Sequence, residues 1–498
     1  MTRDAAGVGE GLAAARPARP IVTGEAIHVV GVAGAGASAA ALLAHRAGAH
    51  VTGCDAGGPS PYTAALDAVG IPVSWAHDPA HVTAVRPDRL AVTKAITAVD
   101  AHHPELEAAR AAGVPLEPWQ QVVADAAVGR TLVAVAGTHG KSTTAGWLVH
   151  VLVAAGHDPA AFVGALLPPE LTGGLPATAR WGRGPAFVVE ADEYAGNFDA
   201  YRPDIAIVTS AEWDHPDVFA DRDAVIAAFA AWLGNARDGA TLVANAGDDG
   251  VKALIDRLRD ARLRLATYAL TDDQAPDRHA RLLGRIVDAD RSGTTVEIRG
   301  LGSEPSITVR LATAGRHNVA NALAVAAAAE ALGVESAAIA DGLGTFPGVG
   351  RRLERKGEAR GVVVYDDYGH HPTAIRATIG AIRQREPGRR VWAVYEPLTY
   401  HRTAALLDDF AEALATADAV AIADIWAGRD PDTTVATPQG LADAVARRRP
   451  GMTVDAPGSV EATADWLAGE VRPGDAVLVM GGGKSYRIGE RLLERLSD

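Results

Sequence analysis

The chain has 498 residues, 48% of them hydrophobic and 22% charged, so it can bury the cores of two or three domains of roughly 100–200 residues and is not disordered. A net charge of −14 argues against broad nucleic-acid binding, which needs clustered Lys and Arg. The same charge is compatible with a local basic site for an anionic small molecule.

Residues 1–22 are rich in Ala, Gly, Arg and Pro and lack a continuous apolar stretch, so we expect a flexible tail and not a signal peptide. No run of 18 strongly apolar residues follows, which argues against membrane insertion. Cys54 is the only cysteine, so no internal disulfide can form, which fits a reducing compartment. We therefore expect a cytoplasmic protein.

The first domain is predicted to span residues 23–128. A strand at Ala26–Gly31, a Gly/Ala turn, a helix to about Ala47 and a strand at Ala49–Cys54 form the βαβ unit of a parallel sheet. The turn has GxxGxG spacing, and Asp55 ends the second strand. A turn of this kind either places a diphosphate at the helix N-terminus or packs the helix tightly on the sheet, and both interpretations stay open.

The second domain is predicted to span residues 129–346 and opens with a strand at Leu132–Ala136. The turn Gly137–Thr143 follows, with a helix from about Lys141 to Ala155. Backbone N–H groups of such a turn can cradle phosphates, while the lysine neutralises them and the Ser142 hydroxyl can reach Mg²⁺. The simpler alternative is a glycine-rich turn with a surface lysine.

Acidic residues follow two further predicted strands, Ala186–Glu190 and Ile205–Thr209. Carboxylates at the carboxyl ends of parallel strands lie where ligands bind, and Mg²⁺ prefers oxygen ligands. Glu190 is therefore a candidate metal ligand. Taken alone, His215 is more often a capping or packing residue, and Glu193 is expected to be a solvated charge.

The rest of the chain alternates between strands and helices. Residues 280–311 are typical of antiparallel strands, and Asn318–Leu332 is an Ala-rich helix that Asn318 could cap. A linker at Thr345–Arg352 leads to a third α/β domain at residues 347–498. Its predicted strands and helices are Gly361–Tyr365, Pro372–Arg385, Arg390–Tyr395, Thr403–Ala415, Ala419–Ala423 and Ala476–Met480. The segment 366–372 holds two acids, a tyrosine and two histidines, and indicates either a binding site or a structural His–Asp network.

Seven segments occur in the order GVAGAGAS, GTHGKST, EADE, AEWDHPD, GRHNVANA, FPGVGRRLE and DDYGHHPT. Together they resemble the Mur ligase family, most closely the members that join UDP-N-acetylmuramate to L-alanine in peptidoglycan precursor synthesis. The resemblance implies a Rossmann-like domain for the UDP sugar, a central P-loop ATPase domain with a mostly parallel sheet, and a Rossmann-like C-terminal domain for the amine. It also implies ATP and Mg²⁺, and an acyl-phosphate intermediate formed with release of ADP.

The resemblance assigns roles by motif. The ATP-binding residues would be Gly137, Thr138, His139, Gly140, Lys141, Ser142, Thr143, Asn318, Arg352 and Asp366. The metal-binding residues would be Ser142, Glu190 and His215. The substrate-binding residues would be Gly34, Gly36, Ser38, Asp55, His139, Tyr368, His370 and Arg402. The catalytic residues would be Lys141, Glu190, His215, Arg352 and His370.

Two positions depart from the family pattern. Ser142 replaces the usual threonine, and Thr399 stands where an arginine is expected near the amino-acid carboxylate. Loss of that guanidinium removes a bidentate clamp, so a murein tripeptide is an alternative amine to L-alanine. Two other classes are a nicotinamide-dependent oxidoreductase built on the first glycine turn and a non-catalytic nucleotide-binding protein. The sequence leaves the choice between monomer and dimer open.

Overall fold

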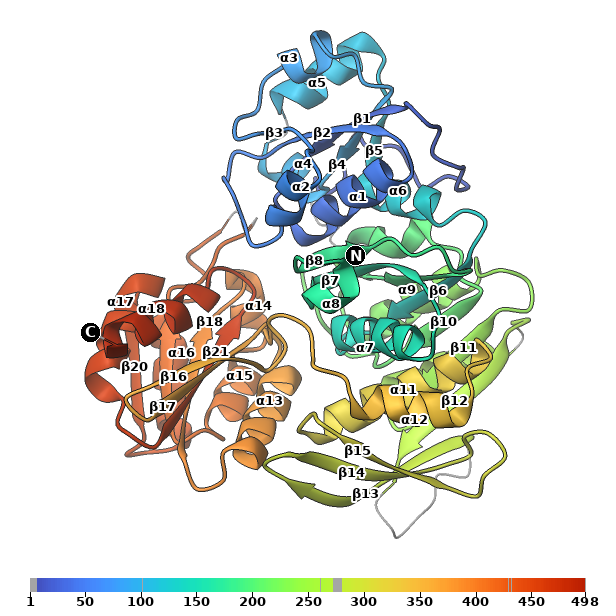
Figure 1. The fold of residues 1–498 in the computed structure, drawn as a ribbon. Helices are drawn as coiled ribbons and strands as arrows, with labels where there is room; N and C mark the ends of the chain where they lie inside the picture. The colour runs from blue at the N-terminus through green and yellow to red at the C-terminus, as the bar shows by residue number, and fades with distance from the viewer. Residues whose placement is uncertain are drawn as a thin grey trace.

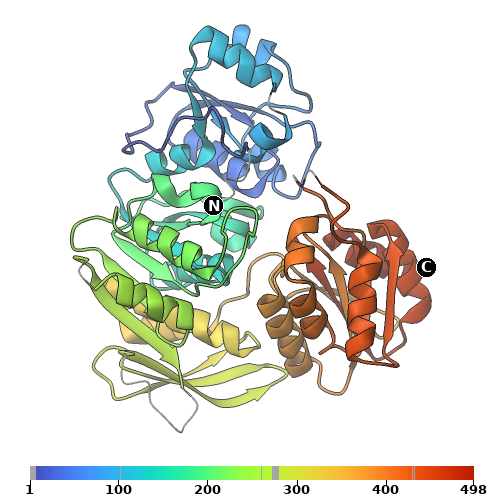
Figure 2. The same cartoon turned by 180° about the vertical axis from the view of Figure 1, so that it is seen from behind.

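The computed structural model describes residues 7–100, 102–259, 261–271, 280–428, 430 and 432–497. These residues form three α/β domains, each around its own sheet (Figure 1). The N-terminal domain (blue) lies at one end of the central domain (green to yellow), and the C-terminal domain (orange to red) lies beside it, as Figure 2 shows from behind. The predicted three-domain α/β class is confirmed.

The N-terminal sheet is fully parallel, with the strand order β3-β2-β1-β4-β5. Strand β1 lies at its centre and is covered on both faces. Successive side chains of a strand point to opposite faces of the sheet. Val29 packs with α1 on one face, and Val30 packs with Val82 of α3 and Leu106 of α5 on the other. The elements are β1 (Ala26–Val30), α1 (Ala35–Arg46), β2 (His50–Cys54), α2 (Ala64–Ala68), β3 (Val73–Ser74), α3 (Ala80–Thr83), β4 (Arg89–Val92), α4 (Ala95–Val99), α5 (Pro104–Ala112), β5 (Leu116–Pro118) and α6 (Trp119–Ala126).

Residues 7–22 lie along this domain, so the expectation of a flexible tail is wrong for them; residues 1–6 lie outside the described part. Arg16 contacts Glu117 at 2.6 Å and Asp125 at 2.7 Å. Both carboxylates are buried beside Arg89. Buried carboxylates need cationic partners, and Arg16 in this segment is a second such partner in addition to Arg89.

The central sheet has ten strands in the order β15-β14-β13-β12-β11-β10-β6-β9-β7-β8. Its middle is parallel, and β13, β14 and β15 pair antiparallel as the alternation in residues 280–311 predicts. Helices α7 and α11 are buried along most of their length, which their small and apolar residues allow. The elements are β6 (Thr131–Ala136), α7 (Lys141–Ala154), β7 (Ala160–Leu167), α8 (Pro169–Thr172), β8 (Ala177–Arg180), β9 (Ala186–Glu190), η1 (Tyr194–Ala200), β10 (Ile205–Val208), α9 (Arg222–Leu233), β11 (Thr241–Asn245), α10 (Asp249–Arg257), β12 (Arg264–Leu270), β13 (Leu282–Asp290), β14 (Gly293–Arg299), β15 (Ile307–Leu311), α11 (Arg316–Ala331) and α12 (Ser336–Gly344).

The C-terminal sheet has the order β16-β17-β21-β18-β19-β20 and is parallel except for β16. Helix α13 begins at Pro372 as predicted, because proline suits the first turn and the His371 side chain accepts a hydrogen bond from Thr373 N. The single helix predicted at Thr403–Ala415 is instead two helices that meet at Leu406. The elements are β16 (Glu354–Ala359), β17 (Val362–Asp367), α13 (Pro372–Arg385), β18 (Arg390–Glu396), α14 (Tyr400–Ala405), α15 (Leu407–Leu414), β19 (Ala419–Ala423), α16 (Pro438–Arg448), β20 (Thr453–Gly458), α17 (Val460–Glu470), β21 (Asp475–Gly481) and α18 (Tyr486–Ser497).

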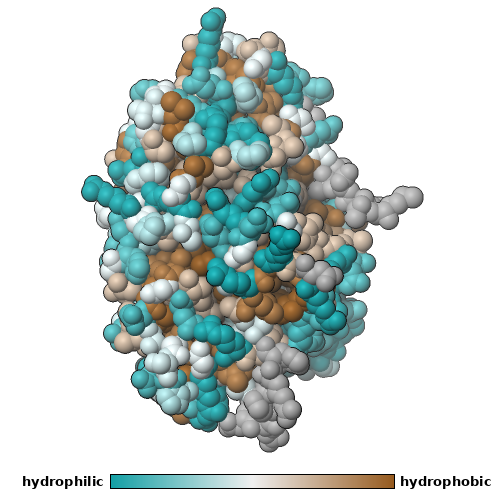
Figure 3. Space-filling model, turned by 90° about the vertical axis from the view of Figure 1, so that its right-hand side faces the viewer, coloured by the Kyte–Doolittle hydropathy of each residue, from teal (hydrophilic) through white to brown (hydrophobic). Residues whose placement is uncertain are grey.

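The surface carries hydrophobic residues in small patches scattered among hydrophilic ones on the face drawn in Figure 3. Within the described residues, every helix is too short or too polar to cross a bilayer.

Candidate active site

The turn between β6 and α7 lies at the carboxyl edge of the central sheet. Gly137 has φ +127° and Gly140 has φ +81°, conformations that favour glycine. The turn also runs close to the end of β10, because a Cβ on Gly137 would lie 2.1 Å from Thr209 Oγ1. The His139 N–H donates to Ser210 Oγ at 3.0 Å, which fixes the turn against its neighbour.

Lys141 begins α7 and is surrounded by carboxylates. Its Nζ lies 2.8 Å from Glu193 Oε2 and 3.4 Å from Asp192 Oδ1. Burial alone would lower the pKa of Lys141, but these two carboxylates raise it, so the ammonium is charged. Glu193 is buried, so the expectation that it is a solvated charge is wrong: the strand end turns it inward to Lys141.

Three polar groups from two domains meet beside this lysine. The Ser142 hydroxyl donates to Glu190 Oε1 at 3.1 Å, and Glu190 Oε2 accepts from Gly164 N at 2.6 Å. Arg352, the last residue of the linker, donates to Ser142 Oγ at 2.9 Å, and its guanidinium lies 4.7 Å from the centre of the Tyr368 ring. The C-terminal domain thus places a cation against the glycine turn at the start of α7.

His215 follows β10 with φ +55° and lies next to a buried ion pair. Arg402 Nη2 lies 2.8 Å from Asp214 Oδ1 and donates to His215 Nδ1 at 3.0 Å. Burial lowers the pKa of His215 to about 4, so its ring is neutral. As placed, His215 would offer Nδ1 to a metal only if Arg402 moved away, because a neutral imidazole has one free lone pair.

His370 also lies beside Asp214, with its Nε2 4.0 Å from Asp214 Oδ2. Its Nδ1 lies 3.0 Å from the Tyr368 carbonyl oxygen, which only accepts, so Nδ1 carries the proton and Nε2 is the free acceptor. Burial, together with Arg402, holds the pKa of His370 well below its usual value. A neutral ring with a free acceptor can take a proton from an amine.

Two of the residues expected to bind ATP, Asn318 and Asp366, interact with neighbouring groups of the protein. Asn318 lies in the first turn of α11, which begins at Arg316, and its Nδ2 donates to Ala314 O at 2.8 Å. Asp366 Oδ2 lies 3.0 Å from Arg351 Nε, and Asp366 lines a smaller cavity of about 550 Å³ that adjoins the larger one between the domains.

In the N-terminal domain, the glycine turn is held by Asp55, whose Oδ2 accepts from Ala33 N at 3.0 Å. Gly36 is required for close packing, because a Cβ there would lie 2.1 Å from the Trp119 ring. Ser38 is fully buried and lies 3.1 Å from Thr178 Oγ1 of the central domain. Among the expected residues Gly34, Gly36, Ser38 and Asp55, only Gly36 lines the large cavity.

The large cavity has a volume of about 880 Å³ and is lined by all three domains. The expected residues that line it are Gly36, Thr138, His139, Gly140, Lys141, Ser142, Thr143, Glu190, His215, Asn318, Arg352, Tyr368, His370 and Arg402. Further lining residues were given no individual role from the sequence, among them Lys94, Asp192, Glu212, Asn321 and His371.

Some of these missed residues carried a signal in the sequence. Glu212 and His371 lie within two of the quoted segments, and Lys94 follows a buried strand end. Glu212 Oε2 accepts from Thr373 Oγ1 at 2.7 Å and lies 3.3 Å from His139 Nε2, which joins the turn to the C-terminal domain. Asn321 also lies within a quoted segment, GRHNVANA, and the packing of α11 against Gly140 brings it to the turn.

Three family models match the chain in succession: "Mur ligase family, catalytic domain" at residues 26–131, "Mur ligase middle domain" at residues 135–329, and "Mur ligase, glutamate ligase domain" at residues 351–483. A UDP-N-acetylmuramate–L-alanine ligase of Kineococcus radiotolerans is 40% identical over 474 residues, covering 95% of this chain and 96% of the relative. The protein of the same name from Frankia casuarinae is 37% identical, covering 94% of this chain and 97% of that protein.

Two solved structures share the fold along nearly the whole chain. A UDP-N-acetylmuramate–alanine ligase of Thermotoga maritima matches with a TM-score of 0.76 and 25% identity, covering 94% of this chain and 98% of the other. A murein peptide ligase of Psychrobacter arcticus matches with a TM-score of 0.71 and 25% identity, covering 95% and 99%.

Proposed function

The chain belongs to the Mur ligase family, and from that premise we propose that it is the ATP-dependent ligase that joins UDP-N-acetylmuramate to L-alanine. The observation that carries the proposal is the meeting of Lys141, Ser142 and Arg352 in one cavity between three domains. Relatives named for this activity are similar over more than nine-tenths of the chain. The proposed domains are residues 23–128, 129–346 and 347–498. We also propose that the protein is cytoplasmic, and cell fractionation should recover it in the cytoplasmic fraction.

The reaction follows from the charges of the reactants. A carboxylate is a poor electrophile, so its oxygen first attacks the γ-phosphorus of ATP, and the bond to ADP breaks to leave an acyl phosphate. The amine nitrogen then attacks the acyl carbon, phosphate leaves, and the nitrogen loses a proton. Both partners of the first step are anions, so Lys141 and Arg352 must offset their repulsion. His370, with Nε2 free, is the proposed acceptor of the amine proton.

Mg²⁺ fits the oxygen donors of this site, since it binds carboxylates and hydroxyls while keeping several waters. Ser142 and Glu190 would hold it, and His215 could join them only after Arg402 releases its Nδ1. When bound, the ion supplies positive charge at the transferring phosphoryl group. The chain's own part is to hold Glu190 in place through the Gly164 N–H.

Glu190→Gln should raise the Mg²⁺ concentration needed for half-maximal activity by at least about tenfold, since it keeps the shape of the side chain and removes its charge. The measurement is initial rate against Mg²⁺ at saturating ATP. Glu170→Gln, on an exposed turn of α8, is the matched control and should leave the curve unchanged. An unaltered Mg²⁺ dependence in Glu190→Gln would remove Glu190 from the proposed metal site.

The identity of the amine is tested by phosphate release with UDP-N-acetylmuramate, ATP, Mg²⁺ and a panel of amines. We expect L-alanine to give a kcat/KM at least about tenfold above that of larger amino acids, because one extra methylene in a side-chain site changes kcat/KM by about tenfold or more. The second candidate is the murein tripeptide, favoured by Thr399 in the cavity wall and by the engagement of Arg402 with Asp214. Faster release with the tripeptide would select that candidate, and no release with any amine would reject both in favour of a non-catalytic nucleotide-binding protein.

A further inference from the structure

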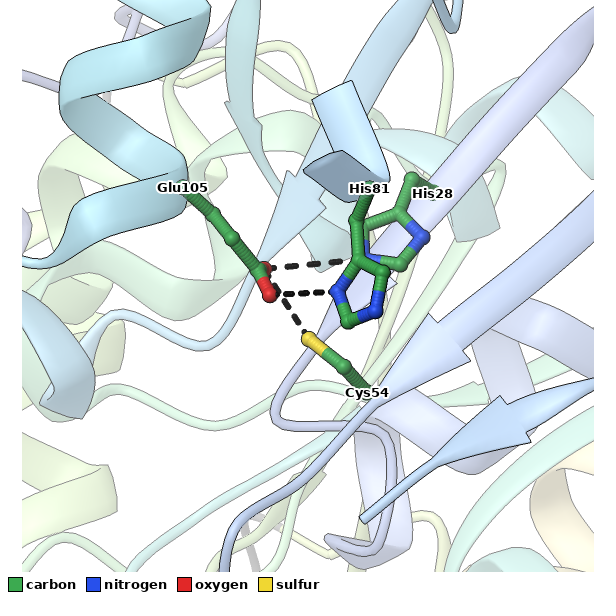
Figure 4. A group of neighbouring side chains, drawn as sticks. All are labelled: His28, Cys54, His81 and Glu105. Carbon is green, nitrogen blue, oxygen red and sulfur yellow. Dashed lines mark hydrogen bonds and ion pairs between the residues drawn. The ribbon is translucent and has the colours of Figure 1, made fainter. Parts of the chain in front are cut away.

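A cluster of metal-ligating side chains lies in the N-terminal domain, between its sheet and helices α3 and α5. It consists of His28 on β1, Cys54 at the end of β2, His81 on α3 and Glu105 on α5, and we refer to it as the His–Cys cluster. Figure 4 shows the four side chains pointing toward one another, and one potential ligand atom from each lies within 4.8 Å of all the others. None of the four lines the cavity between the domains, so the cluster is separate from the ligase site.

Glu105 is the centre of the cluster and is fully buried. Its Oε1 lies 2.7 Å from His81 Nδ1, and its Oε2 accepts from Cys54 Sγ at 3.0 Å. Its Oε1 also accepts from Asp78 N at 2.9 Å, so the carboxyl group is held in place among the other three side chains. Within the described residues no lysine or arginine pairs with Glu105, so a bound cation would give this buried carboxyl group a fixed partner.

His28 gives independent evidence that the cluster is built for a ligand. The residue is 2% exposed, and its Nδ1 lies 2.7 Å from Thr52 Oγ1, which fixes the ring. Its Nε2 points into the cluster, 3.5 Å from Glu105 Oε2, and makes no hydrogen bond with any described residue. One nitrogen anchored by an outer partner and the other left free is the usual arrangement of a metal-binding histidine.

Two more histidines border the cluster. His77 Nδ1 lies 3.3 Å from Cys54 Sγ, and the His77 ring packs edge-on against His103, with 4.3 Å between ring centres. His103 is buried, and neither of its nitrogens has a hydrogen-bond partner in the described part of the chain. Unsatisfied buried imidazoles are costly, and their grouping here indicates a site that attracts a soft or borderline cation.

We propose that the His–Cys cluster binds one divalent transition-metal ion of the zinc class. One thiolate, two imidazoles and one carboxylate make the four-ligand set that zinc prefers, whereas Mg²⁺ and Ca²⁺ require mostly oxygen ligands. Binding forms a metal–sulfur bond and releases the Cys54 thiol proton to solvent, while Glu105 exchanges its hydrogen bonds for the metal.

The ion joins four chain segments directly behind the glycine turn. The Cys54 carbonyl accepts from Gly31 N at 2.9 Å and from Val32 N at 3.1 Å, and the next residue, Asp55, holds Ala33 N. The ion therefore stabilises the base of the turn, in a structural role that does not depend on the proposed ligase activity.

The experiment uses the full-length protein, stripped with a strong chelator and titrated with Co²⁺ and, separately, with Zn²⁺. Because Cys54 is the only cysteine, a thiolate-to-cobalt absorption band reports this site alone, even if the acidic groups near His215 also bind the ion. We expect one equivalent bound with a micromolar or lower Kd, and a rise of several degrees in Tm with Zn²⁺ but not with Mg²⁺.

Two variants complete the test. His81→Ala, on the partly exposed side of the cluster, should weaken Co²⁺ binding by at least about 100-fold. Thr52→Val keeps every ligand and removes only the anchor of His28, so it should weaken binding by about tenfold with the cobalt band retained. Absence of the band in the stripped wild-type protein, binding only at millimolar concentration, or wild-type affinity in His81→Ala would overturn the proposal.

Discussion

Lys141→Ala should lower turnover by about 100-fold to 1000-fold. This is the usual effect of removing one preorganised charge from a site where negative charge develops. The Lys141 ammonium lies at the start of α7, on the turn expected to hold phosphate, within 4 Å of two carboxylates. When an anionic carboxylate approaches ATP, this ammonium reduces their repulsion. The measurement is steady-state phosphate release at saturating substrates.

The same substitution removes the cation that compensates Glu193. Burial raises the pKa of Glu193 to about 7 even beside Lys141, so without Lys141 the carboxyl group must take up a proton or stay buried without its partner. Lys141→Ala alone therefore mixes loss of catalysis with loss of stability. The double variant Lys141→Ala/Glu193→Gln separates the two effects, because the amide needs no counter-charge. We expect it to recover most of the wild-type Tm while staying inactive. Recovery of activity together with stability would show that Lys141 has only a structural role.

Gly137→Ala should weaken ATP binding by at least about 100-fold, because the turn cannot keep its backbone conformation. An alanine at φ +127° is strained by about 1 to 3 kcal/mol. Its Cβ would also lie 2.1 Å from Thr209 Oγ1 and 2.9 Å from Ser210 N, and the second contact is with backbone that cannot turn aside. The N–H groups of the turn must therefore move away from the phosphate position. Calorimetric titration with ATP measures the effect.

Gly174→Ala is the matched control, because Gly174 has φ +124° but no atom of the described residues lies within 4 Å of the position that a Cβ would take there. It carries the same backbone strain without the collision. We expect a small loss of Tm and wild-type ATP affinity. Equal ATP affinity in Gly137→Ala and Gly174→Ala would mean that the turn does not bind phosphate.

The order and type of the main elements could be predicted because each depends on neighbouring residues. Apolar runs such as 186–190 form buried parallel strands, and Pro372 begins a helix, as local chemistry requires. The grouping of Lys141 and Glu190 at one edge also followed from sequence, since parallel strands all present their carboxyl ends there. The prediction of one helix at Thr403–Ala415 was wrong, because no glycine or proline marks the break between two helices at Leu406.

The sequence by itself therefore determined the three α/β domains and the family to which the chain belongs, and it predicted a phosphate-binding role for the turn Gly137–Thr143. Only the tertiary structure decided which charges are buried together: Glu193 with Lys141, Asp366 with Arg351, and Arg16 with Asp125. It also decided that Cys54 and Glu105 meet, although 51 positions separate them. Local pattern sets how a segment folds, but the partner of a buried charge depends on how separate segments pack, and burial makes that pairing necessary.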